Sequence, residues 1–297
     1  MASPNDFGAL LARVEGILGR VEALLPPALP PPDWQATAFR WRKRAGVGHL
    51  QAVAHPHAIR LDDLVAIDEQ KRAIDANTRQ FVAGFPANNV LLTGSRGTGK
   101  SSLVKAMLAK YAGRGLRLIE VDKSDLVDLP DIASQIADRT ERFVVFCDDL
   151  SFDASEAGYK ELKAALDGSV AGRADNVLIY ATSNRRHLMP EFMRDNLAAR
   201  HQEDGEVHPA EAVEERVSLS ERFGLWLTFY PFRQDDFLDI VAHWLDELGI
   251  GRSEHDRAKA EALQFALQRG SRSGRIALQF ARDFAGRHLL PTSRTRR

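Results

Sequence analysis

The chain has 297 residues, of which 44% are hydrophobic and 27% charged, and these values are typical of a folded globular protein rather than a disordered or fibrous one. Its 40 Lys and Arg residues nearly balance its 41 Asp and Glu residues, so the formal net charge of −1 does not favour a globally basic nucleic-acid binder. The single cysteine, Cys147, excludes an intramolecular disulfide and a cysteine-rich zinc site. We find neither a signal peptide nor a membrane-spanning stretch, and therefore expect a cytoplasmic protein with no membrane partner.

Residues 1–32 are predicted to form a separate N-terminal segment. Apolar residues repeat at helical spacing within residues 7–25, which predicts an amphipathic helix that either docks on its own domain or binds a partner. Five prolines in residues 26–32 predict an extended linker.

Residues 33–60 are predicted to connect this segment to the core. Their run FRWRKR, at residues 39–44, mixes basic and aromatic side chains. Two interpretations stay open: a stacking surface for single-stranded nucleic acid or a nucleotide, and a basic strand or helix end anchored by its aromatic residues.

Residues 61–231 are predicted to form an α/β core. Short apolar runs separated by helical periodicity predict a parallel five-stranded sheet with flanking helices, whose strands lie at 90–92, 116–121, 143–147, 177–180 and 225–229. Residues 232–297 are predicted to form a C-terminal helical lid, with helices near 233–248, 253–269 and 273–288. The acidic segment 201–216 is predicted to be a long exposed loop between the last two strands.

The strongest motif follows the first predicted strand of this core. Residues 94–101 read GSRGTGKS, which matches the phosphate-binding pattern G-x-x-x-x-G-K-[ST] between a strand and a helix. Its glycines let backbone N–H groups converge on a phosphate, and the start of the next helix adds a favourable potential for anions. In this pattern the lysine binds the β- and γ-phosphates and the following hydroxyl binds Mg²⁺. The predicted nucleotide-binding residues of the loop are Gly94, Ser95, Arg96, Gly97, Thr98, Gly99, Lys100, Ser101 and Ser102.

Polar side chains follow two later strands. Asp148 is predicted to bind Mg²⁺ together with Ser101, and Asp149 to polarise the attacking water. Asn184 ends the next strand, where its amide can reach the γ-phosphate and that water. The residues after Asn184 do not form the N-K-x-D signature of guanine recognition, so ATP is favoured over GTP. Cys147 lies inside its strand and is interpreted as a small buried hydrophobe rather than a reactive thiol.

This set of motifs resembles that of the AAA+ ATPases, a branch of the P-loop NTPases, over about residues 60–288. The resemblance implies MgATP hydrolysis and assembly into a homo-oligomer. It also implies that Arg222 is an arginine finger acting in trans on ATP bound to the neighbouring subunit. Arg275 resembles the second sensor of the lid, with Arg272 as the alternative. Val65 and Ile67 lie where this family packs against adenine.

Over most of the chain, including ANNVLLTGSRGTGKSSLVKA, CDDLSF and NVLIYATSNRRHLMP, the sequence is similar to an uncharacterised bacterial family of AAA+-like ATP-binding proteins. Many AAA+ proteins have Glu where Asp149 stands, and the shorter side chain predicts slow turnover. We therefore expect an ATPase that remodels or loads an unidentified protein or nucleic-acid client. The alternative is a slow ATP-dependent switch or adaptor. A small-molecule kinase is disfavoured because it has no need of Asn184, Arg222 and Arg275.

Overall fold

The computed structural model describes residues 8, 13–17, 20, 30–151, 162–166, 175–184 and 221–289. The helix predicted over 7–25 falls for the most part outside these residues, and the predicted acidic loop 201–216 lies wholly outside them.

The described strands form one sheet in the order β2-β1-β4-β5-β6-β3-β7. Neighbouring strands are parallel except for the antiparallel pair β1 and β2. Their bounds are β1 Ala38–Arg44, β2 Val47–Ala52, β3 Val90–Gly94, β4 Leu116–Glu120, β5 Arg142–Cys147, β6 Val177–Ser183 and β7 Leu225–Phe229. All five predicted strands are confirmed, and the sheet has two more than were predicted.

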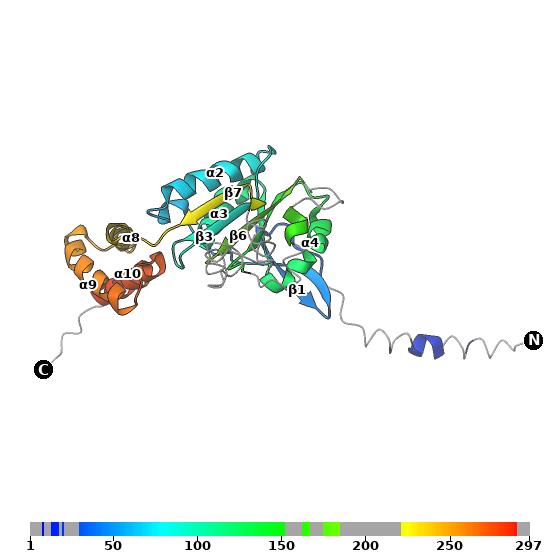
Figure 1. Cartoon of the computed structure of the whole chain (residues 1–297). Coiled ribbons are helices and arrows are strands. Elements are labelled where there is room, and N and C mark those ends of the chain that lie inside the picture. The colour runs from blue at the N-terminus through cyan, green and yellow to red at the C-terminus, as the bar shows by residue number, and fades with distance from the viewer. Residues whose placement is uncertain are drawn as a thin grey trace, which may run out of the picture.

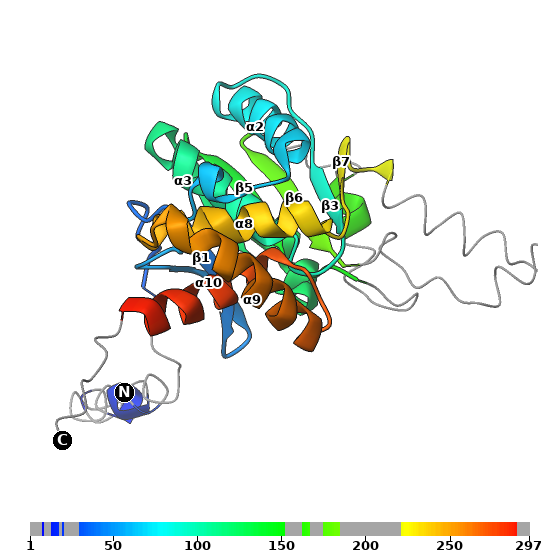
Figure 2. The ribbon, with the colours of Figure 1, turned by 90° about the vertical axis from the view of Figure 1, so that its left-hand side faces the viewer.

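The helices described are α2 Asp68–Val82, α3 Lys100–Tyr111, α4 Leu129–Ile136, α8 Gln234–Glu247, α9 His255–Gln268 and α10 Gly274–Leu289. Short 3-10 turns lie at η1 Leu61–Asp63, η2 Ala112–Arg114, η3 Lys123–Asp128 and η4 Arg252–Glu254. The three predicted lid helices are confirmed as α8, α9 and α10, which lie together at one end of the sheet (Figure 1 and Figure 2). No helix in the described part of the chain is long and apolar enough to cross a membrane.

Both faces of the sheet are covered, because successive residues of each strand point to opposite faces. Phe146 of β5 packs in a cluster with α2, α3 and the lid, whereas its neighbour Val145 packs in a second cluster with α4. The buried side chains of α8 and α10, such as Phe237 and Phe280, belong to the same cluster as those of α2 and α3. The lid is therefore continuous with the core on that side of the sheet.

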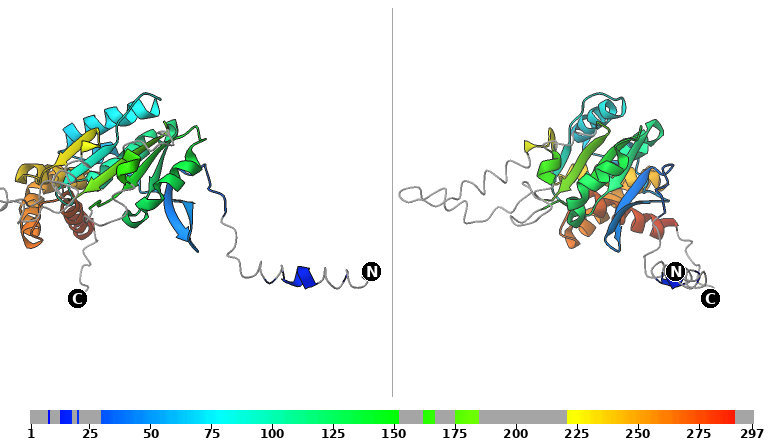
Figure 3. Two further views of the ribbon diagram at one scale, coloured as in Figure 1. Left: turned by 45° about the vertical axis from the view of Figure 1, so that its right-hand side comes forward. Right: turned by 90° about the vertical axis from the view of Figure 1, so that its right-hand side faces the viewer.

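Residues 38–52 form a hairpin at the edge of the sheet far from β7 (Figure 3). Its turn is Ala45-Gly46, and both residues have positive φ angles, as two-residue hairpin turns of this kind require. The aromatic side chains of Phe39 and Trp41 are each only 1% exposed. The nucleic-acid stacking interpretation of 39–44 is therefore wrong, and a basic strand anchored by its aromatic residues is what forms.

The basic residues of this hairpin are bound to acidic residues of the core. Arg40 pairs with Glu120 at 2.8 Å, and Lys43 pairs with Asp128 at 2.7 Å. Asp128 also accepts a 2.8 Å hydrogen bond from Nε1 of Trp41. These contacts attach the hairpin to β4 and η3, so residues 33–60 are not only a connection but supply two strands of the sheet.

Candidate functional site

The phosphate-loop motif connects β3 to α3, as the sequence predicts. Gly94, Gly97 and Gly99 all have positive φ angles, which side chains with a Cβ adopt at a cost. A Cβ at Gly94 would also lie 1.9 Å from the carbonyl oxygen of Phe229, so only glycine lets β3 end this close to β7. Gly99 is the N-cap of α3, and the loop thus ends at the amino end of that helix, where backbone N–H groups are available to an anion.

Lys100 lies inside this loop. Its ammonium donates hydrogen bonds of 2.7 Å to the carbonyl oxygens of Gly94 and Ser95. A third bond, of 3.1 Å, reaches Oδ1 of Asn184 at the end of β6. Burial lowers the pKa of Lys100 to about 8, although the nearby carboxylates of Asp148 and Asp149 act in the opposite direction. The ammonium is thus held by neutral oxygens in a place where an anionic ligand would stabilise its charge.

Ser101 and Asp148 meet beside the loop. The Ser101 hydroxyl donates a 2.6 Å hydrogen bond to Oδ1 of Asp148, although the residues come from α3 and the end of β5. Thr182 of β6 donates a second bond, of 2.5 Å, to the same oxygen. A hydroxyl and a carboxylate that converge in this way are suitable ligands for Mg²⁺, which prefers oxygen and keeps several waters.

Thr182 is a site residue that the sequence analysis missed. Its hydroxyl donates to Asp148 and accepts a 2.9 Å bond from the backbone N–H of Asp149, so it orients both acids. The pairing of Cys147 with Ala181 in the parallel ladder brings the ends of β5 and β6 together. The sequence does place Thr182 just before Asn184 at the end of a predicted strand. Its hydrogen-bond partners, however, depend on which strands are neighbours in the sheet.

Asp149 and Asn184 are also in contact. The Asn184 amide nitrogen donates a 2.5 Å hydrogen bond to Oδ1 of Asp149. Asp149 has a φ of 54°, an uncommon value for a residue with a side chain, and such conformations concentrate at functional sites. Asn184 therefore bridges Lys100 on one side and Asp149 on the other.

A cavity of about 840 Å³ extends from these residues to the lid. The predicted site residues that line it are Val65, Ile67, Arg96, Gly97, Thr98, Gly99, Lys100, Ser101, Ser102, Asp148, Asp149, Asn184 and Arg275. Gly94, Ser95 and Arg222 are not among the lining residues. The lining also includes His57, Ile240, Trp244 and Arg282, which the sequence analysis did not assign to the site. Trp244 and Ile240 were not recognisable from the sequence because their helical periodicity is that of ordinary lid packing.

Part of the lining of this cavity is apolar. Val65 and Ile67 face it from the segment before α2, and Ile240 and Trp244 face it from α8. Ala66, between the first two, has a φ of 64°. An apolar region next to a phosphate loop can hold a flat base such as adenine.

The lid is hydrogen-bonded directly to the phosphate loop. The backbone N–H of Gly274, the first residue of α10, donates a 2.9 Å bond to the carbonyl oxygen of Gly97. A Cβ at Gly97 would lie 2.8 Å from Cβ of Ser273, so the loop packs against the Ser273 side chain without room for a side chain of its own at this position. Arg275 follows and lines the nucleotide-sized cavity, whereas Arg272 lines a neighbouring pocket with Ser95 and Arg96. This geometry favours Arg275 over Arg272 as the lid arginine of the site.

Arg222 lies just before β7, between Glu221 and the buried Phe223. A Cβ at Gly224 would lie 2.4 Å from Oδ1 of Asn88, so glycine is needed where the chain enters β7. Arg222 is not among the residues that line the cavity.

The fold and site together define an α/β protein with a phosphate-loop motif at the carboxyl end of a mostly parallel sheet and a C-terminal helical lid. The chain belongs to the family described as "Protein of unknown function (DUF815)", whose model matches residues 34–288. This confirms the expected membership of an uncharacterised family. No curated protein matches the chain.

Solved structures similar to this fold include AAA+ ATPases of low sequence identity. A single-residue variant of Thermotoga maritima RuvB is 15% identical with a TM-score of 0.43, covering 75% of this chain and 71% of that chain. A chain of the HORMA:CdnC:Trip13 complex of E. coli MS115-1 is 14% identical with a TM-score of 0.47, covering 75% and 90%. The Aeropyrum pernix Orc1 protein in complex with DNA is 16% identical with a TM-score of 0.49, covering 76% and 61%.

Proposed function

We propose that this protein is an ATPase of the AAA+ type that binds MgATP between its core and its lid and hydrolyses it. The observation that carries the proposal is the hydrogen-bonded set beneath the phosphate loop. On one side, the Ser101 hydroxyl lies 2.6 Å from Oδ1 of Asp148. On the other side, Lys100 and Asp149 are both hydrogen-bonded to Asn184. These contacts gather the loop lysine, two magnesium ligands and an acid next to a polar amide within a single cavity.

Each group has a role in this proposal. Lys100 binds the β- and γ-phosphates and leaves the carbonyl oxygens that hold it now. Ser101 and Asp148 hold Mg²⁺, which neutralises the charge that develops on the phosphates. Asp149 orients the attacking water, and Asn184 holds both Asp149 and the γ-phosphate side of the site. Val65 and Ile67 pack against the base.

In this proposal the lid moves in response to the nucleotide bound at this site. Because Gly274 is hydrogen-bonded to Gly97, a change in the loop on binding or release of phosphate changes the contact that begins α10. Arg275 is proposed as the sensor that reaches the γ-phosphate from the same helix. We propose further that Arg222 acts in trans in a homo-oligomer, and that the movement of lid against core remodels or loads a protein or nucleic-acid client.

A second candidate function rests on Asp149. Its side chain is one methylene shorter than Glu, and its Oδ1 already accepts a 2.5 Å hydrogen bond from the Asn184 amide. Poor orientation of the water would give slow hydrolysis, and the protein would then be an ATP-dependent switch or adaptor that binds its partner in the ATP state.

Phosphate release from ATP by the purified full-length protein tests the proposal. Hydrolysis that requires Mg²⁺ and exceeds about one turnover per minute supports the ATPase, since typical enzymes work at 1–10³ per second. Slower turnover with tight ATP binding supports the switch. Failure to bind ATP at all contradicts both functions.

A further inference from the structure

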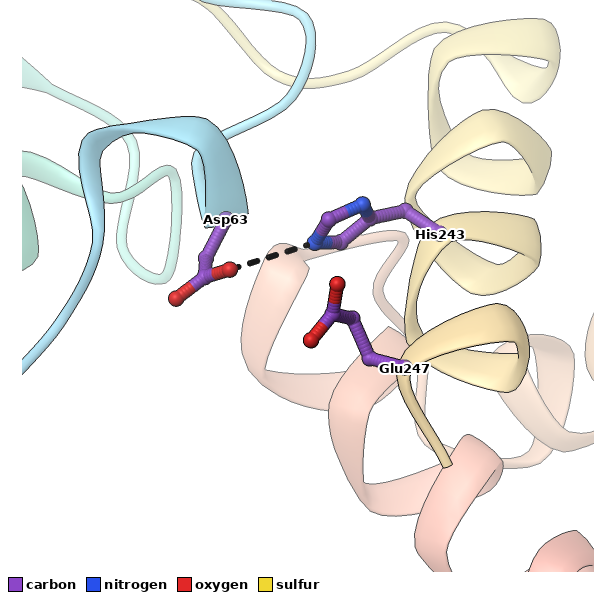
Figure 4. A group of neighbouring side chains, drawn as sticks. All are labelled: Asp63, His243 and Glu247. Carbon is purple, nitrogen blue, oxygen red and sulfur yellow. Dashed lines mark ion pairs between the residues drawn. The ribbon is translucent and has the colours of Figure 1, made fainter. Parts of the chain in front are cut away.

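Three side chains that can bind metal converge where the lid meets the core, at the edge of the nucleotide cavity. They are Asp63 of η1 and His243 and Glu247 of α8, and one ligand atom from each lies within 4.8 Å of the other two. Figure 4 shows the three side chains turned toward one another across the junction. Nothing in the proposed ATP site uses this group.

The separation between His243 and Asp63 fits a shared cation better than a hydrogen bond. Nε2 of His243 lies 3.6 Å from Oδ1 of Asp63, which is too long for a hydrogen bond. Ligand atoms at 2.0–2.2 Å from a tetrahedral zinc lie about 3.4 Å apart. Nε2 is also buried and has no hydrogen-bond partner among the described residues, and a buried polar atom of this kind costs stability unless something satisfies it.

Asp63 is held by a neighbouring backbone group in an orientation that suits metal binding. The backbone N–H of Arg60 donates a 3.0 Å hydrogen bond to Oδ2 of Asp63, which leaves Oδ1 directed at His243. Such support of a ligand by a neighbouring group is typical of metal sites. His243 and Glu247 are four residues apart on α8 and therefore share one face of that helix.

Exposure falls across the group from Glu247 to Asp63. The Glu247 side chain is 44% exposed, whereas His243 and Asp63 are 22% and 13% exposed. Arg60 approaches Glu247 only at 3.8 Å and is 66% exposed, so its guanidinium can move aside into solvent. A cation can thus enter past Glu247 and reach the two more buried ligands.

We propose that Asp63, His243 and Glu247 form a binding site for a divalent cation of the zinc class, with water completing the tetrahedron. One imidazole and two carboxylates are a ligand set that zinc accepts and that magnesium, which prefers oxygen alone, does not. Because Asp63 and the neighbouring Trp244 both line the nucleotide cavity, the cation joins lid and core at its mouth. The site is separate from the Mg²⁺ site at Ser101 and Asp148.

The chain offers a matched control for this site. His255 also has a buried Nε2 to which no residue in the described part of the chain is hydrogen-bonded, and this atom lies 3.4 Å from Oδ1 of Asp246. It belongs to no group of three potential ligands among the described residues. A histidine with one carboxylate should bind zinc far more weakly than a histidine with two.

The test is Zn²⁺ binding to the full-length protein, freed of metal with a chelator and measured without nucleotide. We expect one high-affinity Zn²⁺ per chain by calorimetry, visible absorption bands of a tetrahedral ion when Co²⁺ replaces it, and a Zn²⁺-dependent rise in Tm. Glu247→Gln and His243→Asn should each weaken Zn²⁺ binding at least about tenfold, since even the loss of a supporting group costs about 10–100-fold. His255→Asn should leave the Zn²⁺ affinity unchanged.

Circular dichroism of each variant in the presence of chelator establishes that it is folded. Glu247→Gln changes a partly exposed side chain, so it keeps the test informative if His243→Asn does not fold. Wild-type Zn²⁺ affinity in Glu247→Gln and His243→Asn would overturn the proposal. A loss of Zn²⁺ affinity in His255→Asn as large as in those two variants would overturn it too. The absence of saturable binding at millimolar Zn²⁺ would overturn it as well. Because no readout uses ATP, the result is independent of the proposed ATPase.

Discussion

The ammonium of Lys100 and the amide oxygen of Asn184 lie 3.1 Å apart, so the phosphate loop is joined to the end of β6 by a direct side-chain contact. The amide nitrogen of the same Asn184 is bound to Asp149. One amide therefore links the loop lysine to the acid proposed to orient water.

Lys100→Ala should abolish ATP binding or reduce it at least about 100-fold. The substitution removes the only loop cation that bonds inside the phosphate loop in the described structure, and a charged hydrogen bond to phosphate is among the stronger ones. Fluorescent-nucleotide titration measures the effect. Lys105→Ala, on the same helix but outside the cavity lining, is the matched control and should bind ATP normally. Equal affinities for the two variants would contradict the assignment of the loop.

ATP affinity should fall as the pH rises above about 8. Burial lowers the pKa of Lys100 to about 8 in the free protein, and only the ammonium form binds phosphate well. Phosphate binding stabilises the charged form, so affinity is full below this pKa and weakens by up to about tenfold per pH unit above it. Dissociation constants between pH 7 and 9.5 measure the effect. A flat profile over that range would contradict a role for the Lys100 charge.

Arg222→Ala should slow hydrolysis by about 10³ to 10⁵ while leaving ATP binding unchanged, since an arginine finger acts on the transition state. Wild-type specific activity should rise with protein concentration as subunits assemble. Mixing Arg222→Ala with Lys100→Ala should restore activity, because the second variant supplies Arg222 to ATP bound by the first. Specific activity that is flat with concentration, or no recovery on mixing, would contradict action in trans.

Gly48→Ala should destabilise the protein by about 1–3 kcal/mol, the usual cost of overpacking. A Cβ at Gly48 would lie 2.0 Å from the Trp41 ring, which is fixed by its bond to Asp128. Thermal and denaturant unfolding measure the loss. Gly113→Ala is the control, because nothing lies within 4 Å of a Cβ there. Equal stability of both variants would contradict the packing of the β1–β2 hairpin.

The sequence predicted the parts of this molecule that have a local signature. The buried strands read as apolar runs, and the loop from Gly94 to Ser101 has a fixed spacing that only one local structure satisfies. Cys147 is buried as expected, and burial raises its thiol pKa to about 12. Ser101 and Asp148 meet at the carboxyl end of the sheet although β6 lies between β3 and β5, the strands that precede them.

Features that depend on distant partners could not be predicted in this way. The β1–β2 hairpin carries charged residues that suggest a solvated segment, and they are explained only by Glu120 and Asp128 across the sheet. Thr182 and Trp244 have ordinary local patterns and become site residues through tertiary contacts. Asp63 and His243 are far apart in the sequence, so their meeting at the lid junction needs the folded structure.

We propose that this cavity hydrolyses MgATP by means of Asp149, and a comparison of the wild type with Asp149→Asn tests this role. ATP binding and phosphate release should be measured on the same preparations. We expect Asp149→Asn to bind ATP with wild-type affinity, because its amide keeps the size of the carboxylate. Phosphate release should fall by at least about 100-fold, because no base orients the water. Unchanged phosphate release by Asp149→Asn would contradict this role of Asp149 in hydrolysis.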